Sequence, residues 1–321
     1  MQTVSASARD LTEPAMPRAQ GGSSPQHLLV TLLGDYWIRH ERDLPSAGLI
    51  DLLAEFGVTR PSARAALSRL LRRGLVEVRR AGRQTFYRLS DHAAERMAEG
   101  GRRIASFGLD SDWDGRWTIV AFSIPEHRRE SRHLLRSRLS WFGFAPLYDA
   151  VWVSATSTAA DARAVLTSLD VSTATVFTAT ADTTVDRSPL SAWDLERLAA
   201  VYTSFIDETR PLLEAVLAGT VTPRQALIAR TRLMDTYRRF PGTDPGLPSA
   251  HMPAGWPRDQ ARSLFTEVYN ALGPLAESRV KQIMGAHDAE AAARARFQSV
   301  DQLCAAPDRR PEDGPGNRTR R

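Results

Sequence analysis

Apolar positions between residues 24 and 57 recur at helical spacing and predict two helices. Ser24-Pro25 has the sequence of an N-cap followed by proline at the first helical position, so the first helix begins there and runs to about Ile38. The second helix spans about Ser46–Phe56, and Gly57 is suited to the position just beyond its end.

Residues 58–90 predict a turn, a third helix and a hairpin. The third helix covers about Pro61–Gly74. Leu75–Arg80 and Gln84–Leu89 then alternate around Ala81-Gly82-Arg83, which is typical of a β-hairpin. Helix, helix, tight turn, helix and hairpin are the elements of a winged helix-turn-helix, which we predict over residues 24–90.

The middle of the chain predicts strands and helices in alternation. A linking helix, about Ser90–Phe107, falls mostly within residues 91–112. Six segments then follow in the order strand, helix, strand, strand, helix, strand, which is that of a ferredoxin-like split βαβ sandwich over residues 113–185. These segments are Trp117–Ile124, Glu126–Phe142, Phe144–Tyr148, Val151–Ser154, Asp161–Leu169 and Ala174–Ala179.

The remainder predicts a helical C-terminal domain over residues 190–300. Its three helices are Trp193–Ala218, Pro223–Arg239 and Arg258 to about Phe297. Residues 1–23 and 305–321 are polar or small, contain proline and glycine, and predict a disordered leader and tail. The expected fold class is therefore α+β.

The third predicted helix has one apolar face and one face suited to DNA. At 100° per residue, Ala63, Ala66, Leu67 and Leu70 fall on the same side. The opposite side combines small residues with arginines and no acid, so it could approach base edges in a major groove. An ordinary solvated helix would more often mix acids with bases. The candidate DNA-binding residues on this helix are Arg60, Ser62, Arg64, Ser68, Arg69 and Arg72.

Positive charge is concentrated in the same stretch. Residues 57–90 contain nine arginines and one glutamate, a net charge of +8, whereas the whole chain carries +5. A basic surface on a protein that is otherwise slightly acidic indicates a polyanionic partner, here double-stranded DNA. Arginines beside the hairpin turn would contact phosphates or a minor groove. The candidates there are Arg79, Arg80 and Arg83.

Other features exclude whole classes of protein. No apolar run approaches the ~18–20 residues that a membrane-spanning helix requires, so we expect no membrane partner. Residues 1–22 lack the apolar core of a secretory signal. The single cysteine, Cys304, excludes internal disulfides and a cysteine-cluster metal site. We therefore expect a cytoplasmic protein.

The chain shows no pattern for catalysis, a metal or a cofactor. None of its seven histidines lies three or four residues from another, so none forms the helical pair that binds zinc. It has no G-x-S-x-G elbow, P-loop or G-x-G-x-x-G motif. We expect a protein that is not an enzyme and that has no catalytic residue, metal site or cofactor.

An ordered set of motifs resembles the PaaX family of transcriptional repressors. The motifs follow the family's order from about Pro25 to Tyr269, and this order makes the resemblance specific. They are Leu32-Leu33-Gly34-Asp35-Tyr36, Arg64-Ala65-Ala66-Leu67-Ser68-Arg69-Leu70, Gly82-Arg83-Gln84-Thr85-Phe86-Tyr87-Arg88-Leu89, Trp113-Asp114-Gly115-Arg116-Trp117, Gly143-Phe144, Val151-Trp152-Val153-Ser154, Tyr237-Arg238-Arg239, Asp244-Pro245-Gly246-Leu247-Pro248, Met252-Pro253-Ala254-Gly255-Trp256 and Val268-Tyr269.

The resemblance implies a function and partners. Members of the family repress operons for aromatic-acid catabolism, such as that of phenylacetic acid, and are released from operator DNA by an aryl-CoA thioester. It also implies a homodimer and a central domain similar to the Cas2 nuclease. Nuclease chemistry would need carboxylates at the end of the first strand of that domain, and Ala121-Phe122-Ser123-Ile124-Pro125 contains none.

An aryl-CoA effector would need aromatic side chains around its acyl group and arginines around its phosphates. The alternative for each such residue is that it binds no ligand, since buried aromatic residues usually belong to the core and arginines on helices usually face solvent. The candidate effector-binding residues are Arg230, Tyr237, Arg238, Arg239 and Trp256.

Two short stretches depart from the family pattern. Ala155-Thr156 occurs where members usually carry Pro-His, and Asp235-Thr236 where they tend to carry His-Glu. Both lie outside the predicted DNA-binding domain, so they leave repression as the expectation and the identity of the effector open. The alternative function is a DNA-binding regulator with a degenerate sensor domain, which acts through protein partners and binds no small molecule.

Overall fold

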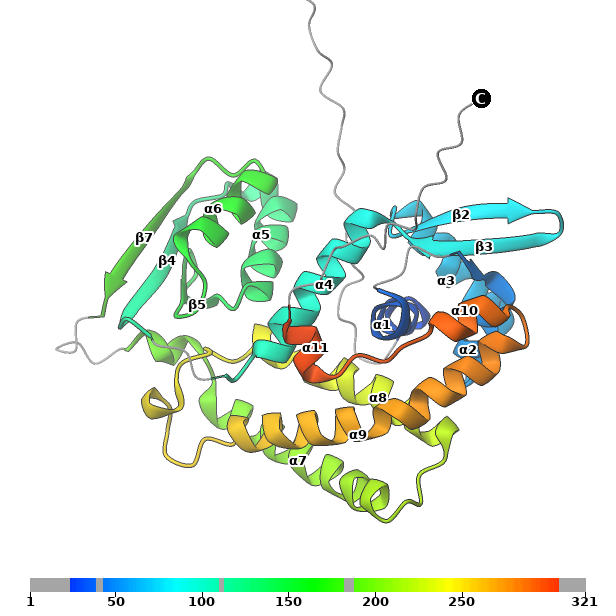
Figure 1. The fold of residues 1–321 in the computed structure, drawn as a ribbon. Helices are drawn as coiled ribbons and strands as arrows, with labels where there is room; N and C mark the ends of the chain where they lie inside the picture. The colour runs from blue at the N-terminus through cyan, green and yellow to red at the C-terminus, as the bar shows by residue number, and fades with distance from the viewer. Residues whose placement is uncertain (1–23, 39–42, 110–112, 182–187, 306–321) are drawn as a thin grey trace, which may run out of the picture.

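The structure is a computed structural model that describes residues 24–38, 43–109, 113–181 and 188–305. It has a basic N-terminal unit, a central unit built on a four-stranded sheet, and a helical C-terminal unit (Figure 1). The predicted leader, residues 1–23, lies outside the described residues, as does the predicted tail apart from residue 305.

The N-terminal unit contains the predicted helices and hairpin and one strand more. Its elements are α1 (Pro25–Trp37), β1 (Leu44–Pro45), α2 (Ser46–Ala54), α3 (Arg60–Arg72), β2 (Val76–Ala81), β3 (Gln84–Leu89) and α4 (Asp91–Ser106). The Ser24 side chain caps α1 as predicted, by accepting from the His27 amide. The two-residue strand β1 pairs with β3, giving the sheet order β1-β3-β2. So short a strand has no periodicity from which to predict it.

The central unit has the predicted order of strands and helices. Its elements are β4 (Arg116–Phe122), η1 (Glu126–Arg128), α5 (Arg129–Trp141), β5 (Ala145–Tyr148), β6 (Val151–Ser154), α6 (Ala159–Ser168) and β7 (Ala174–Thr180). The sheet order is β5-β6-β4-β7 and every neighbouring pair is antiparallel. One face of the sheet packs on α5 and α6, and the other packs through Trp117 and Val153 on Trp193, Leu247 and Met252.

The C-terminal unit is helical and contains one break that the sequence pattern did not predict. Its elements are η2 (Pro189–Ala192), α7 (Leu195–Leu217), α8 (Pro223–Tyr237), η3 (Phe240–Gly242), η4 (Ser249–His251), α9 (Arg258–Gly285), α10 (Ala289–Arg294) and α11 (Val300–Cys304). The predicted single helix from Arg258 to Phe297 is wrong, because α9 ends at Gly285 and extended Asp288 caps a new helix. The break brings residues 295–298 back to α1, where the Arg296 amide donates to the Tyr36 carbonyl at 3.1 Å.

The N-terminal and C-terminal units share one hydrophobic core. Side chains of α1, α2 and α3, such as Leu32 and Leu67, belong to the same buried cluster as Leu227 of α8 and Val268 of α9. In Figure 1, α1 lies at the centre of this assembly, with helices of both units around it. The DNA-binding candidates and the C-terminal helices are thus parts of one packed body.

Candidate nucleic-acid interface

Helix α3 presents the predicted polar face to solvent. Ala63, Ala66, Leu67 and Leu70 are buried, with at most 1% of their surface exposed. Thr59 caps the helix by accepting from the Ser62 amide at 3.4 Å. The exposed residues on the other side include Ser62, Arg64, Ser68, Arg69 and Arg72. The serine side chains are small, so the surface of the helix between the arginines can come close to DNA. Reading base edges in a groove requires such a close approach.

The β2–β3 hairpin projects from the body beside α3 (Figure 1). Ala81 pairs with Gln84, so Gly82 and Arg83 form a two-residue turn, and the Gly82 φ of 58° lies in the region that favours glycine. Arg79, Arg80 and Arg83 are all exposed at this end of the hairpin. The guanidinium of Arg79 lies 4.7 Å from the centre of the Phe86 ring and pairs with Asp43, so it is held against the strand.

Most of this positive charge has no partner inside the protein. Arg64, Arg69, Arg72, Arg80 and Arg83 form no ion pair with any residue that the structure describes. The exceptions are Arg60, whose Nη2 lies 3.1 Å from Asp51, Arg79 with Asp43, and Arg88, whose Nη2 lies 2.6 Å from Glu77. Such exposed pairs contribute only about 0–1 kcal/mol, so a phosphate could replace the acid at little cost.

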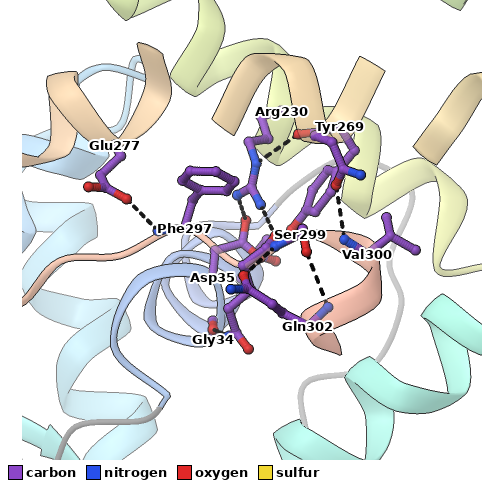
Figure 2. A network of polar contacts seen from close by, with 12 residues as sticks. Gly34, Asp35, Arg230, Tyr269, Glu277, Phe297, Ser299, Val300 and Gln302 are labelled. Carbon is purple, nitrogen blue, oxygen red and sulfur yellow. Dashed lines mark hydrogen bonds and ion pairs between the residues drawn. The ribbon is translucent and has the colours of Figure 1, made fainter. Parts of the chain in front are cut away.

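The structure places Arg230, a predicted effector residue, inside the protein. Its side chain is fully buried between α1, α8, α9 and the segment before α11 (Figure 2). Arg230 donates to Asp35 at 3.0 Å, to the Tyr269 carbonyl at 3.2 Å and to the Gln298 carbonyl at 2.7 Å. It also lies 3.7 Å from the centre of the Tyr269 ring. The expectation that Arg230 faces a ligand phosphate is therefore corrected, because all its nitrogens serve internal contacts.

We name these contacting residues the Arg230 cluster, which comprises Asp35, Tyr36, Arg230, Tyr269 and Gln298. The pKa values of its ionisable groups depend on one another. Burial would lower the pKa of Arg230, but its neighbours, including Tyr269 and Asp35, raise it above the ordinary value, so the guanidinium stays charged. Burial raises the pKa of Asp35 against the opposing effect of Arg230. The Tyr269 hydroxyl donates to the other Asp35 oxygen at 2.7 Å.

The other predicted effector residues do not converge on one cavity. Tyr237 is 1% exposed and stacks on Phe265 at 3.8 Å, and Trp256 packs edge-on against Tyr202. Arg238 lies 2.7 Å from Asp235 and also donates to Thr31 of α1 at 3.3 Å. Burial lowers the pKa of Arg238, and Asp235 opposes this.

Of these residues, only Arg239 lies largely on the surface, with 46% of its side chain exposed. Its Nη2 is 3.6 Å from Asp235, the acid that also pairs with Arg238. The hydrogen bond from Arg238 to Thr31 links this arginine to the N-terminal unit.

Sequence reasoning missed Asp35, Tyr269 and Glu55 as residues that join the units. Glu55, the C-cap of α2, accepts from Arg279 of α9 at 2.8 Å and from Arg224 of α8 at 3.1 Å. Only Asp35 gave a signal, since an acid within an otherwise apolar helix needs a partner when it is buried. The positions of the partners, about 200 residues away, are not contained in any local pattern.

Neither metal-site geometry nor a membrane span is found in the described part of the chain. No group of three or more histidine, cysteine, aspartate or glutamate side chains there is placed to hold a metal ion. No described helix is both long enough and apolar enough to cross a membrane.

Comparison with known families gives three consecutive matches along the chain. They are the PaaX-like protein over residues 24–93, the PaaX protein central Cas2-like domain over residues 110–190 and the PaaX-like protein C-terminal domain over residues 193–282. The chain belongs to the PaaX family. This confirms the resemblance carried by the ordered motifs, and it gives a mixed α+β protein with a Cas2-like centre and a helical C-terminal part.

The chain is similar to one curated relative and to one solved structure. The transcriptional repressor PaaX of Escherichia coli (strain K12) is 29% identical over 264 residues, which cover 79% of this chain and 82% of the relative. PaaX proteins are transcriptional repressors rather than enzymes. The uncharacterized protein Rv0674 from Mycobacterium tuberculosis is 21% identical with a TM-score of 0.48, over 81% of this chain and 98% of that one.

Proposed function

We propose that this protein is a transcriptional repressor that binds double-stranded operator DNA through a winged helix-turn-helix formed by residues 24–90. The observation that carries the proposal is the exposed, acid-free face of α3 beside the arginines of the β2–β3 hairpin. The order of elements and the capped start of α3 fit a recognition helix whose N-terminal half enters a major groove.

We assign two kinds of DNA contact to the exposed residues, one to base edges and one to phosphates. Ser62, Arg64, Ser68 and Arg69 lie on the part of α3 that would meet base edges, where an arginine can donate two hydrogen bonds to a guanine. Contacts to phosphates position the protein and carry no sequence information directly. We assign these to Arg60, Arg72, Arg79, Arg80 and Arg83.

We further propose that two copies act together and that an aryl-CoA thioester releases them. A homodimer would place its two recognition helices about one DNA turn apart, ~34 Å, on an operator with matching half-sites. The regulated genes would be those of a phenylacetate-type catabolic operon, as the family resemblance implies. The central unit, with its ferredoxin-like order of strands and helices, and the helical C-terminal unit would form the rest of each protomer. The protein would act in the cytoplasm.

The decisive experiment is selection of genomic DNA fragments by the purified full-length protein, followed by fluorescence anisotropy on the enriched sequence. A specific repressor should bind the enriched duplex about 10³-fold or more tightly than a scrambled duplex of the same composition. Equal affinity for both duplexes would reject sequence-specific repression.

The alternative regulator, which binds no small molecule, is separated by a second measurement. Phenylacetyl-CoA and a panel of other acyl-CoA esters are titrated into the protein–operator complex and, by calorimetry, into the free protein. Release by an aromatic thioester supports the preferred function. Tight operator binding with no response to any ester favours the regulator with a degenerate sensor.

A further inference from the structure

Asp51 of α2 connects the start of α3 to the C-terminal unit. One of its carboxylate oxygens lies 3.1 Å from Nη2 of Arg60, the first residue of α3. The other lies 2.8 Å from Nε2 of His287, which follows α9 and is 236 residues away in the sequence. Carboxylate oxygens accept hydrogen bonds, so both neighbours donate to Asp51. One acid therefore contacts both an arginine assigned to a DNA phosphate and a histidine of the C-terminal unit.

The packing of α2 against the end of α9 holds His287 beside Asp51 (Figure 1). At Gly48, three residues before Asp51, an added Cβ atom would lie 2.6 Å from the sulfur of Met284 and 3.5 Å from the His287 ring. Glycine allows this close approach. The His287 amide also donates to the Met284 carbonyl at 2.9 Å. The imidazole is thus fixed, while 25% of its side chain stays exposed and can exchange protons with water.

Among the described residues, Arg60 and His287 are the side chains that pair with Asp51. Nearby acids and bases on the same elements have contacts of their own: Glu55 pairs with Arg279, Glu277 pairs with Lys281, and Asp288 caps α10. The other charged groups there are Arg64 on α3 and Glu290 and Arg294 on α10. The charge balance at Asp51 therefore depends mainly on its two direct partners.

The charge of His287 decides what Asp51 does to Arg60. Histidine is the side chain whose charge ordinarily changes between about pH 5 and 8. When His287 is neutral, Arg60 is the cation that balances the Asp51 carboxylate, and that carboxylate opposes a phosphate brought to α3. When His287 is protonated, it neutralises Asp51 and leaves Arg60 available to a phosphate.

We propose that His287 is a positioning residue for DNA binding, which holds Asp51 so that Arg60 can move to a phosphate. This rests on the proposed function and adds a regulation to the same DNA-binding surface. Once Arg60 has moved, the Asp51 charge favours the protonated form of His287, so the complex takes up a proton there. Because such coupling is reciprocal, a lower pH tightens DNA binding. His287 lies beyond residue 282, where the matched C-terminal domain ends.

The test is fluorescence anisotropy of the full-length protein on the enriched operator and on a random duplex, between about pH 6 and 8 at constant ionic strength. The parent should bind both duplexes more tightly at the lower pH. His287→Gln can still donate to Asp51 but carries no charge. It should lose about threefold of that gain per protomer, which is within the range of a partly exposed ion pair. The control His133→Gln, which changes an exposed histidine of α5, should respond as the parent does.

Two further measurements distinguish a proton effect from a structural one. Calorimetry of DNA binding in buffers of different ionisation enthalpy counts the protons taken up, and the count should fall in His287→Gln. Asp51→Asn should tighten DNA binding at about pH 8 and remove most of the effect of His287→Gln in the double variant. Asp207→Asn on α7, the control for losing one exposed acid, should do neither.

The proposal stands if His287→Gln loses the pH response and the proton uptake, and if Asp51→Asn removes this effect. It is overturned if His287→Gln keeps the parent's pH response, if it changes affinity equally at both ends of the range, or if its effect persists with Asp51→Asn. Should His287→Gln fail to fold by circular dichroism, the proton count of Asp51→Asn decides instead. Equal parent affinity for operator and random DNA would refute sequence-specific repression alone, because phosphate contacts can be measured on either duplex.

Discussion

Arg69 and Arg83 have the same side chain but lie on different elements, so we expect them to have different roles in DNA binding. Arg69 stands on the exposed face of α3, whose other side is fixed in the core by Ala66 and Leu70. Arg83 lies in the two-residue hairpin turn and is exposed. A side chain on a rigid helix can select a base, whereas one on a turn is suited to the phosphate backbone.

We therefore expect different effects from removing each arginine. Arg69→Ala should weaken operator binding by ~1–3 kcal/mol and reduce base preference at one position, because a contact to a base edge is lost. Arg83→Ala should weaken operator and random DNA by similar factors. Fluorescence anisotropy on both duplexes measures this, with Arg210→Ala on α7 as a control for loss of one exposed charge. If Arg69→Ala lowered both affinities equally, Arg69 would not be a base reader.

At the scale of elements, α1 is one of the helices through which the N-terminal and C-terminal units hold together. Its Asp35 is paired with Arg230 of α8 and Tyr269 of α9, and its Thr31 accepts from Arg238. Asp35 is part of the Leu-Leu-Gly-Asp-Tyr motif that marks the family resemblance. The structure gives that acid a role, which is to neutralise a buried guanidinium.

Breaking this buried pair should destabilise the protein strongly. Asp35→Ala leaves the Arg230 charge buried without its carboxylate, which should lower the free energy of unfolding by ~3–5 kcal/mol. The double variant Asp35→Leu with Arg230→Met removes both charges and should recover much of that loss. Urea unfolding followed by circular dichroism measures both. A single variant as stable as the parent would show that the pair contributes little to the fold.

The ion pair between Glu55 and Arg279 should make the stability of the folded protein depend on pH. The hydrogen bond from Arg279 lowers the pKa of the Glu55 carboxyl below its ordinary value of 4.5. The carboxylate therefore stabilises the folded state fully above pH ~4.5, and this contribution is lost as the pH falls through the lowered pKa. Glu55→Gln should cost about 1–2 kcal/mol at pH 7. Urea unfolding of parent and variant should show this difference shrinking below pH ~4.5, and a difference that does not change with pH would contradict the assignment.

At the scale of the whole molecule, the distribution of charge matters more than its sum. A net charge of +5 is small, but residues 57–90 alone carry +8, and most of those arginines form no ion pair with a residue that the structure describes. The rest of the chain is slightly acidic. Affinity for DNA should therefore come from one limited surface on each protomer and respond strongly to salt.

The salt dependence of operator binding tests this surface. Each phosphate contact contributes about −0.9 to the slope of log affinity against log salt concentration. Two protomers with three such contacts each should give a slope near −5. Anisotropy titrations over a series of salt concentrations measure it, and a slope shallower than about −2 would contradict the basic surface as the DNA footprint.

The sequence by itself determined the local elements and the exposed face of α3. Helical and alternating spacing report which side of an element is buried, and Ser24, Thr59 and Gly82 act on the backbone within a few residues of themselves. The order of strands and helices in the central unit followed for the same reason. The ordered motifs also sufficed to identify the family.

Only the tertiary structure decided where the polar residues of the helices lie. Arg230 has the local pattern of a solvated helix arginine, but it is buried because Asp35 and two carbonyl groups lie around it after folding. The break after α9 was hidden by an alanine-rich stretch that continues the helical pattern. That break carries residues 295–298 to α1, a contact across more than 200 residues that no local periodicity encodes.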